Sequence, residues 1–85
     1  MAKIEMYSKK MCPFCIRAKS LFKSKGVDII EIPAANNPEK RREMNQRSNG
    51  GNTFPQIFID GKHVGGCDDL YALERSGKLD QLLAA

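Results

Sequence analysis

Two cysteines separated by two residues, Cys12 and Cys15, lie in a short stretch that also carries several cations. Thiols at this spacing can act as a redox pair, in which one thiolate attacks a disulfide and the second thiol resolves the product. They can also supply half of a tetrahedral metal site, or they can be unreactive thiols packed in a core. Which interpretation holds depends on the elements that position the two sulfurs.

The metal interpretation needs further ligands, and His63 and Cys67 are the candidates. Together with Cys12 and Cys15 they have the composition of a Cys₃His zinc set. Pro13 argues against this set, because it stiffens the first pair in a helix start rather than in a glycine turn. The neighbouring cations would also repel Zn²⁺, and we therefore expect no metal and a plain surface role for His63. Placement at a helix start also disfavours two inert core thiols.

The length of 85 residues predicts a single domain, residues 1–85, with a modest core. The apolar fraction of 41% argues against disorder. No apolar run approaches the roughly 20 residues of a membrane span, and the first ten residues lack the apolar stretch of a secretory signal. We therefore expect a cytoplasmic protein, a setting where a Cys-x-x-Cys pair is more often catalytic or metal-binding than structural.

The net charge of +4 is concentrated near the first two cysteines. Residues 1–25 carry Lys3, Lys9, Lys10, Arg17, Lys19, Lys23 and Lys25 against Glu5. Such a surface suits an anionic partner. Nucleic acid is not expected, because no arginine-rich stripe with interleaved aromatic residues accompanies the charge.

The elements around the cysteines are predicted from apolar periodicity. Alternation over residues 3–8 predicts a strand with Ile4 and Met6 on its one buried face. Pro13 suits the first position of the next helix and Cys12 its cap. The predicted buried face of this helix consists of Phe14, Ala18, Leu21 and Phe22, and the helix ends at Gly26.

The rest of the chain predicts a strand over 27–32, a thinly apolar helix from Pro38 to about 49–51, a hairpin and a last helix. Asp60-Gly61 predicts the hairpin turn between strands 56–59 and 62–64. The last helix is expected to have Cys67 or Asp68 as its cap. The order β-α-β-α-β-β-α predicts an α/β protein with a mixed four-stranded sheet flanked by three helices. A Cys-x-x-Cys motif that opens the first helix of such a unit is typical of thioredoxin-like redox proteins.

The helix start predicts different roles for the two thiols. Backbone N–H groups and peptide dipoles at the start of a helix favour the thiolate of Cys12, and nearby cations such as Lys9 and Lys10 add to this. Cys15 lies one turn further in, and we expect it to be more buried and less ionised. We predict that Cys12 is the nucleophile and Cys15 the resolving thiol.

Three stretches, CPFC at the first helix, TFPQIFIDGKHVGG and GGCDDLYAL, together resemble glutaredoxins, particularly the small bacterial dithiol class. The resemblance runs over nearly the whole chain. It implies a thioredoxin fold and glutathione as co-substrate, with no tightly bound cofactor. It also implies reduction of protein–glutathione mixed disulfides and protein disulfides, with ribonucleotide reductase as a candidate protein substrate, and a monomer.

The resemblance further implies a glutathione groove. The implied contacts are Lys9, Phe14, Arg47, Thr53, Phe54, Pro55, Gly66, Cys67 and Asp68. Lys9, with Arg47 or Gln46, would pair with the glycine carboxylate, and a cis Pro55 would turn the Phe54 backbone toward the cysteinyl unit. The start of the last helix and Asp68 would receive the γ-glutamyl end. These charges also match glutathione itself, which carries two carboxylates and one ammonium group.

Two residues depart from the family pattern, Phe14 in place of tyrosine and Phe54 in place of valine, and Phe54 is expected to reshape the groove. Cys67 is expected to be a small, half-buried residue near it. Two other functions remain open from the residues. One is a thioredoxin-like electron donor recharged by a flavoprotein reductase. The other is an iron–sulfur cluster carrier, which Pro13 and Cys15 disfavour because such relatives usually carry one cysteine followed by glycine.

Overall fold

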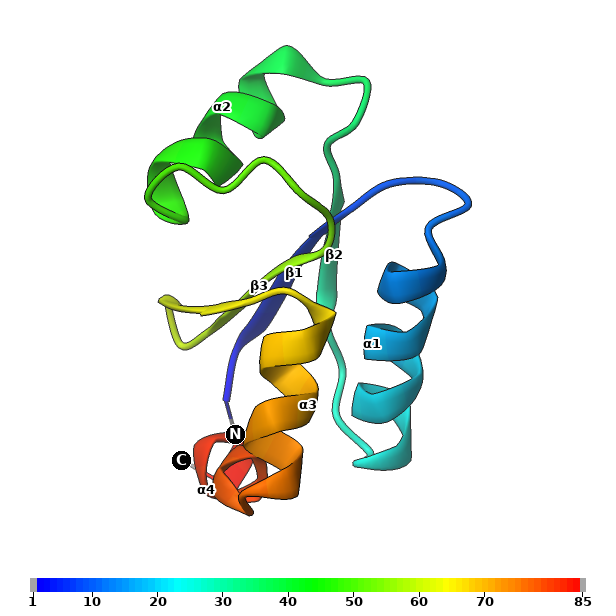
Figure 1. Cartoon of the computed structure of the whole chain (residues 1–85), viewed down its shortest axis with the longest axis vertical. Coiled ribbons are helices and arrows are strands. Elements are labelled where there is room, and N and C mark those ends of the chain that lie inside the picture. The colour runs from blue at the N-terminus through cyan, green and yellow to red at the C-terminus, as the bar shows by residue number, and fades with distance from the viewer. Residues whose placement is uncertain (1, 85) are drawn as a thin grey trace.

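The computed structural model describes residues 2–84 and shows a sheet with helices packed around it (Figure 1). The elements are β1 (Ile4–Ser8), α1 (Pro13–Ser24), β2 (Ile30–Pro33), α2 (Pro38–Arg47), β3 (Gln56–Ile59), β4 (Lys62–Gly65), α3 (Cys67–Arg75) and α4 (Lys78–Ala84). The strand order is β2-β1-β3-β4, with β1 parallel to β2 and antiparallel to β3, and with β3 antiparallel to β4. The predicted mixed four-stranded sheet is therefore confirmed.

The prediction of three helices is wrong, because residues 78–84 form a fourth, α4. Gly77, with φ of 78°, ends the preceding turn and lets the chain begin a new helix. Leu79 and Leu83, four residues apart, are buried against the main core. A helix of seven residues is too short to be stable alone, so this packing decides its conformation.

Alternate residues of the central strands face two separate apolar clusters. Ile4 and Met6 of β1, with Ile57 and Ile59 of β3, pack against α1, α3 and α4. On the other face, a smaller cluster consists of Tyr7, Ala34, Met44 and Phe58. Figure 1 shows the corresponding division, with α2 apart from α1 and α3. The sheet is therefore covered on both faces near its centre.

Tyr7 corrects the prediction that β1 buries only one face. The alternation over residues 3–8 places Tyr7 on the solvent side, yet its side chain is fully buried beneath α2. Its ring meets that of Phe58 edge to face, with centroids 5.7 Å apart. As expected, α2 is the helix with the thinnest apolar face, and Met44 is its buried residue.

Helix α1 begins as predicted, with Pro13 in its first turn and Cys12 at its cap. Ala18 and Phe22 are buried and Leu21 is partly buried, in agreement with the predicted face. Phe14 is the exception, since 52% of it is exposed. It lies in the first turn of α1, beside the cleft described below, where no apolar core covers its ring.

Asp60 and Gly61 form the predicted hairpin turn, and both have positive φ, 51° and 80°. Beyond this turn β4 reaches Gly65, one residue further than predicted. Strand β2 is shorter than predicted, because it begins at Ile30 rather than at residue 27. Within residues 2–84, no helix is long and apolar enough to cross a membrane.

Candidate active site

The sulfur of Cys12 lies at the N-terminal end of α1 and accepts a hydrogen bond from the backbone N–H of Cys15 over 3.2 Å. The cap position arises because Pro13, which has no N–H to lose, starts the helix directly after it. Both the hydrogen bond and the aligned peptide dipoles favour negative charge on this sulfur. The geometry is that of a stabilised thiolate.

The expected difference in burial between the two thiols is not found. Cys12 is 3% exposed and Cys15 is 2% exposed. Burial, with a smaller contribution from the hydrogen bond to Cys12, raises the pKa of Cys15 to about 12. Cys15 is therefore a protonated thiol at neutral pH. All three cysteines, Cys67 included, are free.

A cis peptide bond joins Phe54 and Pro55 beside the thiols, as the resemblance implied. The thiol of Cys12 lies 4.0 Å from the carbonyl oxygen of Phe54, at the limit for a hydrogen bond from sulfur. The loop before β3 thus lies directly against the reactive sulfur. A molecule bound to the backbone of Thr53 and Phe54 would be held next to Cys12.

A cleft of about 380 Å³ lies between this loop, the hairpin and the start of α3. It is lined by Phe14, Gly51, Thr53, Phe54, Gln56, His63, Gly65, Gly66, Cys67, Asp68 and Asp69. The structure thus brings six of the expected contacts into one cavity: Phe14, Thr53, Phe54, Gly66, Cys67 and Asp68. The expected contact Pro55 is buried beneath the same loop.

The backbone at the start of α3 approaches the cleft closely because two glycines precede the helix. Gly65 has φ of 119°, and a Cβ atom there would lie 2.2 Å from a carboxylate oxygen of Asp69. The N-cap is Gly66 rather than the predicted Cys67 or Asp68, and its N–H donates to Asp69 over 3.1 Å. The Asp69 carboxylate therefore caps the start of α3. The exposed Asp68 has no hydrogen-bond or ion-pair partner among residues 2–84.

Cys67 is the first residue of α3 and is buried rather than half-buried, which corrects the expectation. Burial raises the pKa of its thiol, although the positive charge of Arg17 opposes this. Cys67 is thus a protonated, small apolar side chain in the wall of the cleft.

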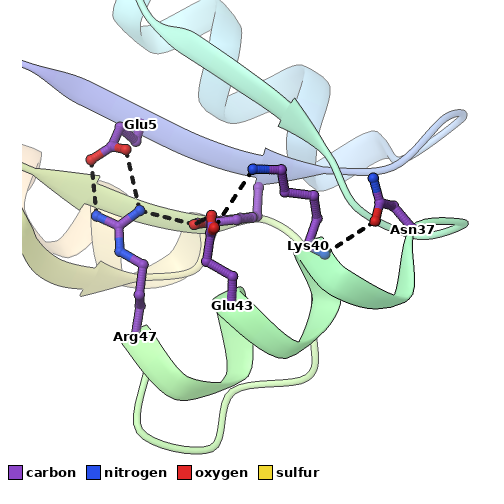
Figure 2. A network of polar contacts seen from close by, with 6 residues as sticks. Glu5, Asn37, Lys40, Glu43 and Arg47 are labelled. Atoms are coloured by element: carbon purple, nitrogen blue, oxygen red, sulfur yellow. Dashed lines mark hydrogen bonds and ion pairs between the residues drawn. The ribbon is translucent and has the colours of Figure 1, made fainter.

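The two expected cations lie in different places. The ammonium group of Lys9 lies 6.0 Å from the ring centroid of Phe54, a lining residue, but Lys9 itself does not line the cleft. Arg47 is not among the lining residues. Figure 2 shows its guanidinium group extending from α2 to Glu5 on β1, with two hydrogen bonds of 2.9 and 3.2 Å.

The same network explains why Arg47 cannot also serve the cleft. Its guanidinium group donates to the hydroxyl of Tyr7 over 2.9 Å and lies 4.2 Å from the ring centroid of Phe58. Glu43 accepts the hydrogen bond of the Tyr7 hydroxyl. The hydrogen bonds from Arg47 hold the pKa of Glu5 below its usual range. Arg47 therefore fastens α2 to the sheet.

Sequence reasoning missed three lining residues: Gly51, Gln56 and His63. His63 is exposed, as expected of a surface residue, but it also lines the cleft and lies 2.7 Å from the amide oxygen of Gln56. A signal was available for this pair, because Gln56 lies two residues before Phe58, the cross-strand partner of His63, and therefore on the same face of the hairpin. Within the described part of the chain, no three histidine, cysteine or acidic side chains are grouped to hold a metal ion.

Comparisons with known proteins agree with this geometry. The family model described as glutaredoxin matches residues 4–64. Glutaredoxin 3 of Escherichia coli strain K12 is 58% identical over 83 residues, which are 98% of this chain and 99% of the relative.

Two solved structures are similar in fold. A solution structure of glutaredoxin from Brucella melitensis has 57% sequence identity and a TM-score of 0.84, covering 98% of this chain and 89% of that one. A crystal structure of a buckwheat glutaredoxin–glutathione complex has 32% identity and a TM-score of 0.87, covering 98% and 77%. These likenesses confirm the predicted thioredoxin-like α/β class.

Proposed function

The chain belongs to the glutaredoxin family and is a glutathione-dependent thiol–disulfide oxidoreductase, and we propose that Cys12 attacks and Cys15 resolves in its reaction. The observation that carries this assignment is the hydrogen bond from the N–H of Cys15 to the sulfur of Cys12, at the edge of a cleft of suitable size for a tripeptide. The sulfur of Cys15, by contrast, is buried, and its pKa is raised to about 12.

With a glutathionylated protein, the Cys12 thiolate attacks the glutathione sulfur, and the bond between that sulfur and the protein sulfur breaks. The protein leaves as a thiolate and takes up a proton, while glutathione stays bound to Cys12 through a new disulfide. A second glutathione thiolate then attacks the bound glutathione sulfur. Oxidised glutathione leaves and Cys12 is again a thiolate, so the net exchange returns the protein to its thiol and consumes one free glutathione thiol.

With a protein disulfide, Cys12 forms a mixed disulfide with the protein and Cys15 then attacks the Cys12 sulfur. The Cys15 proton passes to the leaving protein thiolate, and an intramolecular disulfide remains for glutathione to reduce. Part of the raised pKa of Cys15 comes from its hydrogen bond to Cys12 and from the charge of Cys12. Both contributions end when Cys12 is consumed, so Cys15 ionises more readily at the moment when it must attack.

The cleft offers complementary charge to the two ends of glutathione. The ammonium group of Lys9, beside Phe54, would pair with the glycine carboxylate, and Arg47, which is engaged with Glu5, has no part in our assignment. In the cleft the unpaired Asp68 carboxylate would receive the γ-glutamyl ammonium group. The backbone of Thr53 and Phe54 between them would pair with the cysteinyl unit, which places its sulfur beside Cys12.

Protein substrates would dock on the apolar rim around Cys12. Met11 is 94% exposed, and Phe14 and Ile16 are also exposed, so large apolar side chains surround the reactive sulfur. Lys9 and Lys10 lie beside them. We propose that glutathionylated or disulfide-containing proteins with acidic segments bind here, ribonucleotide reductase being a candidate, and that the enzyme acts as a single-domain monomer in the cytoplasm.

The test is the rate of glutathione-dependent reduction of a small glutathione mixed disulfide by the native chain, by Cys12→Ser and by Cys15→Ser. We expect activity in the native chain and in Cys15→Ser, and none in Cys12→Ser. Reduction of a protein disulfide should be lost in both variants. Full activity in Cys12→Ser would contradict the assignment, and inactivity of the folded native chain would contradict the function.

A further inference from the structure

The side chain of Gln56 connects the cleft to His63, the one histidine of the sequence. Gln56 opens β3 directly after the cis peptide bond and is only 5% exposed. Its amide nitrogen donates to the carbonyl oxygen of Thr53 over 3.0 Å and to the hydroxyl of Thr53 over 3.1 Å. Its amide oxygen lies 2.7 Å from Nε2 of His63. A chain of hydrogen bonds thus runs from β4 through β3 to the loop that lines the cleft.

The chemistry of these groups fixes the direction of each hydrogen bond. The carbonyl oxygen of Thr53 can only accept, so Gln56 must turn its NH₂ group toward Thr53. Its amide oxygen, which can also only accept, then faces His63. The imidazole must therefore carry a hydrogen on Nε2, which in neutral His63 is the Nε2–H tautomer.

The ring of His63 is held in place by its neighbour across the hairpin. His63 lies opposite Phe58 in the register of β3 and β4, next to the register shift between Ile57 and Phe58. The ring centroids of Phe58 and His63 are 5.1 Å apart at an interplanar angle of 38°. Phe58 is itself fully buried and packed against the guanidinium group of Arg47. The donor nitrogen of His63 therefore rests on a rigid support.

Gln56 is also enclosed on its loop side. A Cβ atom at Gly51 would lie 2.9 Å from the amide nitrogen of Gln56, so the backbone of the loop packs directly on the amide. The side chain has hydrogen bonds at both ends of its amide and a contact between them. Its position therefore determines where the backbone of Thr53 lies.

We propose that His63 is a positioning residue for glutathione, which acts through Gln56 to hold the Thr53–Phe54 backbone in the shape that binds the tripeptide. This inference rests on the function proposed above, in which that backbone receives the cysteinyl unit. His63 is not in contact with the reacting sulfurs. Its loss should weaken binding of glutathione-containing substrates and leave the rate of sulfur exchange nearly unchanged.

The central variant is His63→Phe, which keeps a ring against Phe58 but has no N–H to donate. We expect it to raise the KM for a small glutathione mixed disulfide about threefold to tenfold, the effect of about one hydrogen bond, with kcat within about twofold. Gln56→Leu, which removes the amide, should have a similar effect. Lys62→Ala, on the adjacent exposed position of β4, is the matched control and should behave as the native chain.

The double variant separates positioning from direct contact with the substrate. If His63 acts through Gln56, His63→Phe should add little to the KM of Gln56→Leu, whereas additive effects would mean that His63 contacts glutathione itself and would overturn the proposal. Nitrogen-15 chemical shifts of the His63 ring should report the Nε2–H tautomer in the native chain and a mixture in Gln56→Leu. An unchanged KM in folded His63→Phe would also overturn it.

The function and the positioning role fail in different ways. Absence of glutathione-dependent activity in the native chain would contradict the function, and the tautomer measurement would still test the hydrogen bond between Gln56 and His63. Activity in the native chain with an unchanged KM in His63→Phe would contradict only the positioning role. Thermal unfolding of each variant shows that the comparison is made between folded proteins.

Discussion

The backbone N–H of Cys15 lies 3.2 Å from the sulfur of Cys12, so the resolving residue supports the attacking one before any substrate arrives. The N–H of Cys15 donates this hydrogen bond, and the sulfur of Cys12 accepts it. The sulfur of Cys15 itself is buried, and burial is the main reason that its pKa is raised to about 12. The two cysteines at the start of α1 therefore offer different surroundings to a thiolate.

This difference predicts the order of alkylation. Iodoacetamide at pH 7 should label Cys12 first, because a raised pKa keeps Cys15 protonated until the pH approaches 12. At pH 8 only about one Cys15 in 10,000 would be a thiolate if it kept that pKa. Labelling of Cys15 in a Cys12→Ser/Cys67→Ser background should still be slow at pH 8, because burial, the largest cause of its raised pKa, remains when the contributions of Cys12 are removed; mass spectrometry of digested samples measures the labelling. Rapid labelling under these conditions would contradict the prediction.

The charges of Lys9 and Asp68 predict how glutathione binds. Lys9→Gln and Asp68→Asn should each raise the KM for a glutathione mixed disulfide about threefold to tenfold, because each removes one charge-assisted contact. Added salt should weaken the native enzyme more than either variant. Lys23→Gln, an exposed position near the end of α1, is the control. Equal KM values for Lys9→Gln and Lys23→Gln would remove Lys9 from the assignment.

The ion pair between Arg47 and Glu5 predicts a loss of stability and a specific response to acid. Arg47→Met should lower the free energy of unfolding by about 2–3 kcal/mol, because it leaves a partly buried carboxylate without its donor. Lys40→Met, on the same helix in an exposed pair with Glu43, should cost less than about 0.5 kcal/mol. Urea unfolding at pH 7 measures both changes.

The acid response follows from the lowered pKa of Glu5, for which the ordinary value is 4.5. A carboxylate with a lowered pKa stabilises the fold above its ordinary pKa, and this stabilisation is lost as the pH falls through its value in the folded protein. The native chain should therefore lose stability more steeply below pH 4.5 than Glu5→Gln. Parallel curves for the two proteins would show that the pair does not contribute.

The two glycines before α3 predict a strong effect of a single methyl group. Gly65→Ala should be more destabilising than Gly61→Ala, although both positions have positive φ. At Gly61 nothing lies within 4 Å of an added Cβ, so only backbone strain of about 1 kcal/mol applies. At Gly65 the methyl group would displace Asp69 from its cap, and we expect an additional loss of about 1 kcal/mol or more. Thermal or urea unfolding of Gly65→Ala and Gly61→Ala compares their losses of stability directly.

Local signals predicted the parts of the site that depend on neighbouring residues in the chain. Pro13 after Cys12 predicted a cap at the reactive sulfur, and Asp60-Gly61 predicted the hairpin. These predictions hold because proline at a helix start and positive φ in a two-residue turn are settled by local sterics.

The features that the sequence did not predict correctly depend on tertiary packing. Tyr7 is polar at one end, so its alternation with Met6 indicated solvent, but the cover of α2 and the Arg47 network make a buried position favourable. The role of Arg47 could not be read from its charge, since a guanidinium group fits either a bound carboxylate or Glu5. α4 depends on leucine contacts with the distant core, which no short window contains.

The burial of Cys12 has a consequence for the choice of substrates. Only 3% of this residue is accessible, although it carries the attacking sulfur. A disulfide set in a flat or recessed surface could not come within bonding distance without a collision between the two proteins. We expect the enzyme to select disulfides on protruding loops, flexible chain ends or locally unfolded segments, so that the mobility of the substrate, as much as its sequence, decides which proteins are reduced.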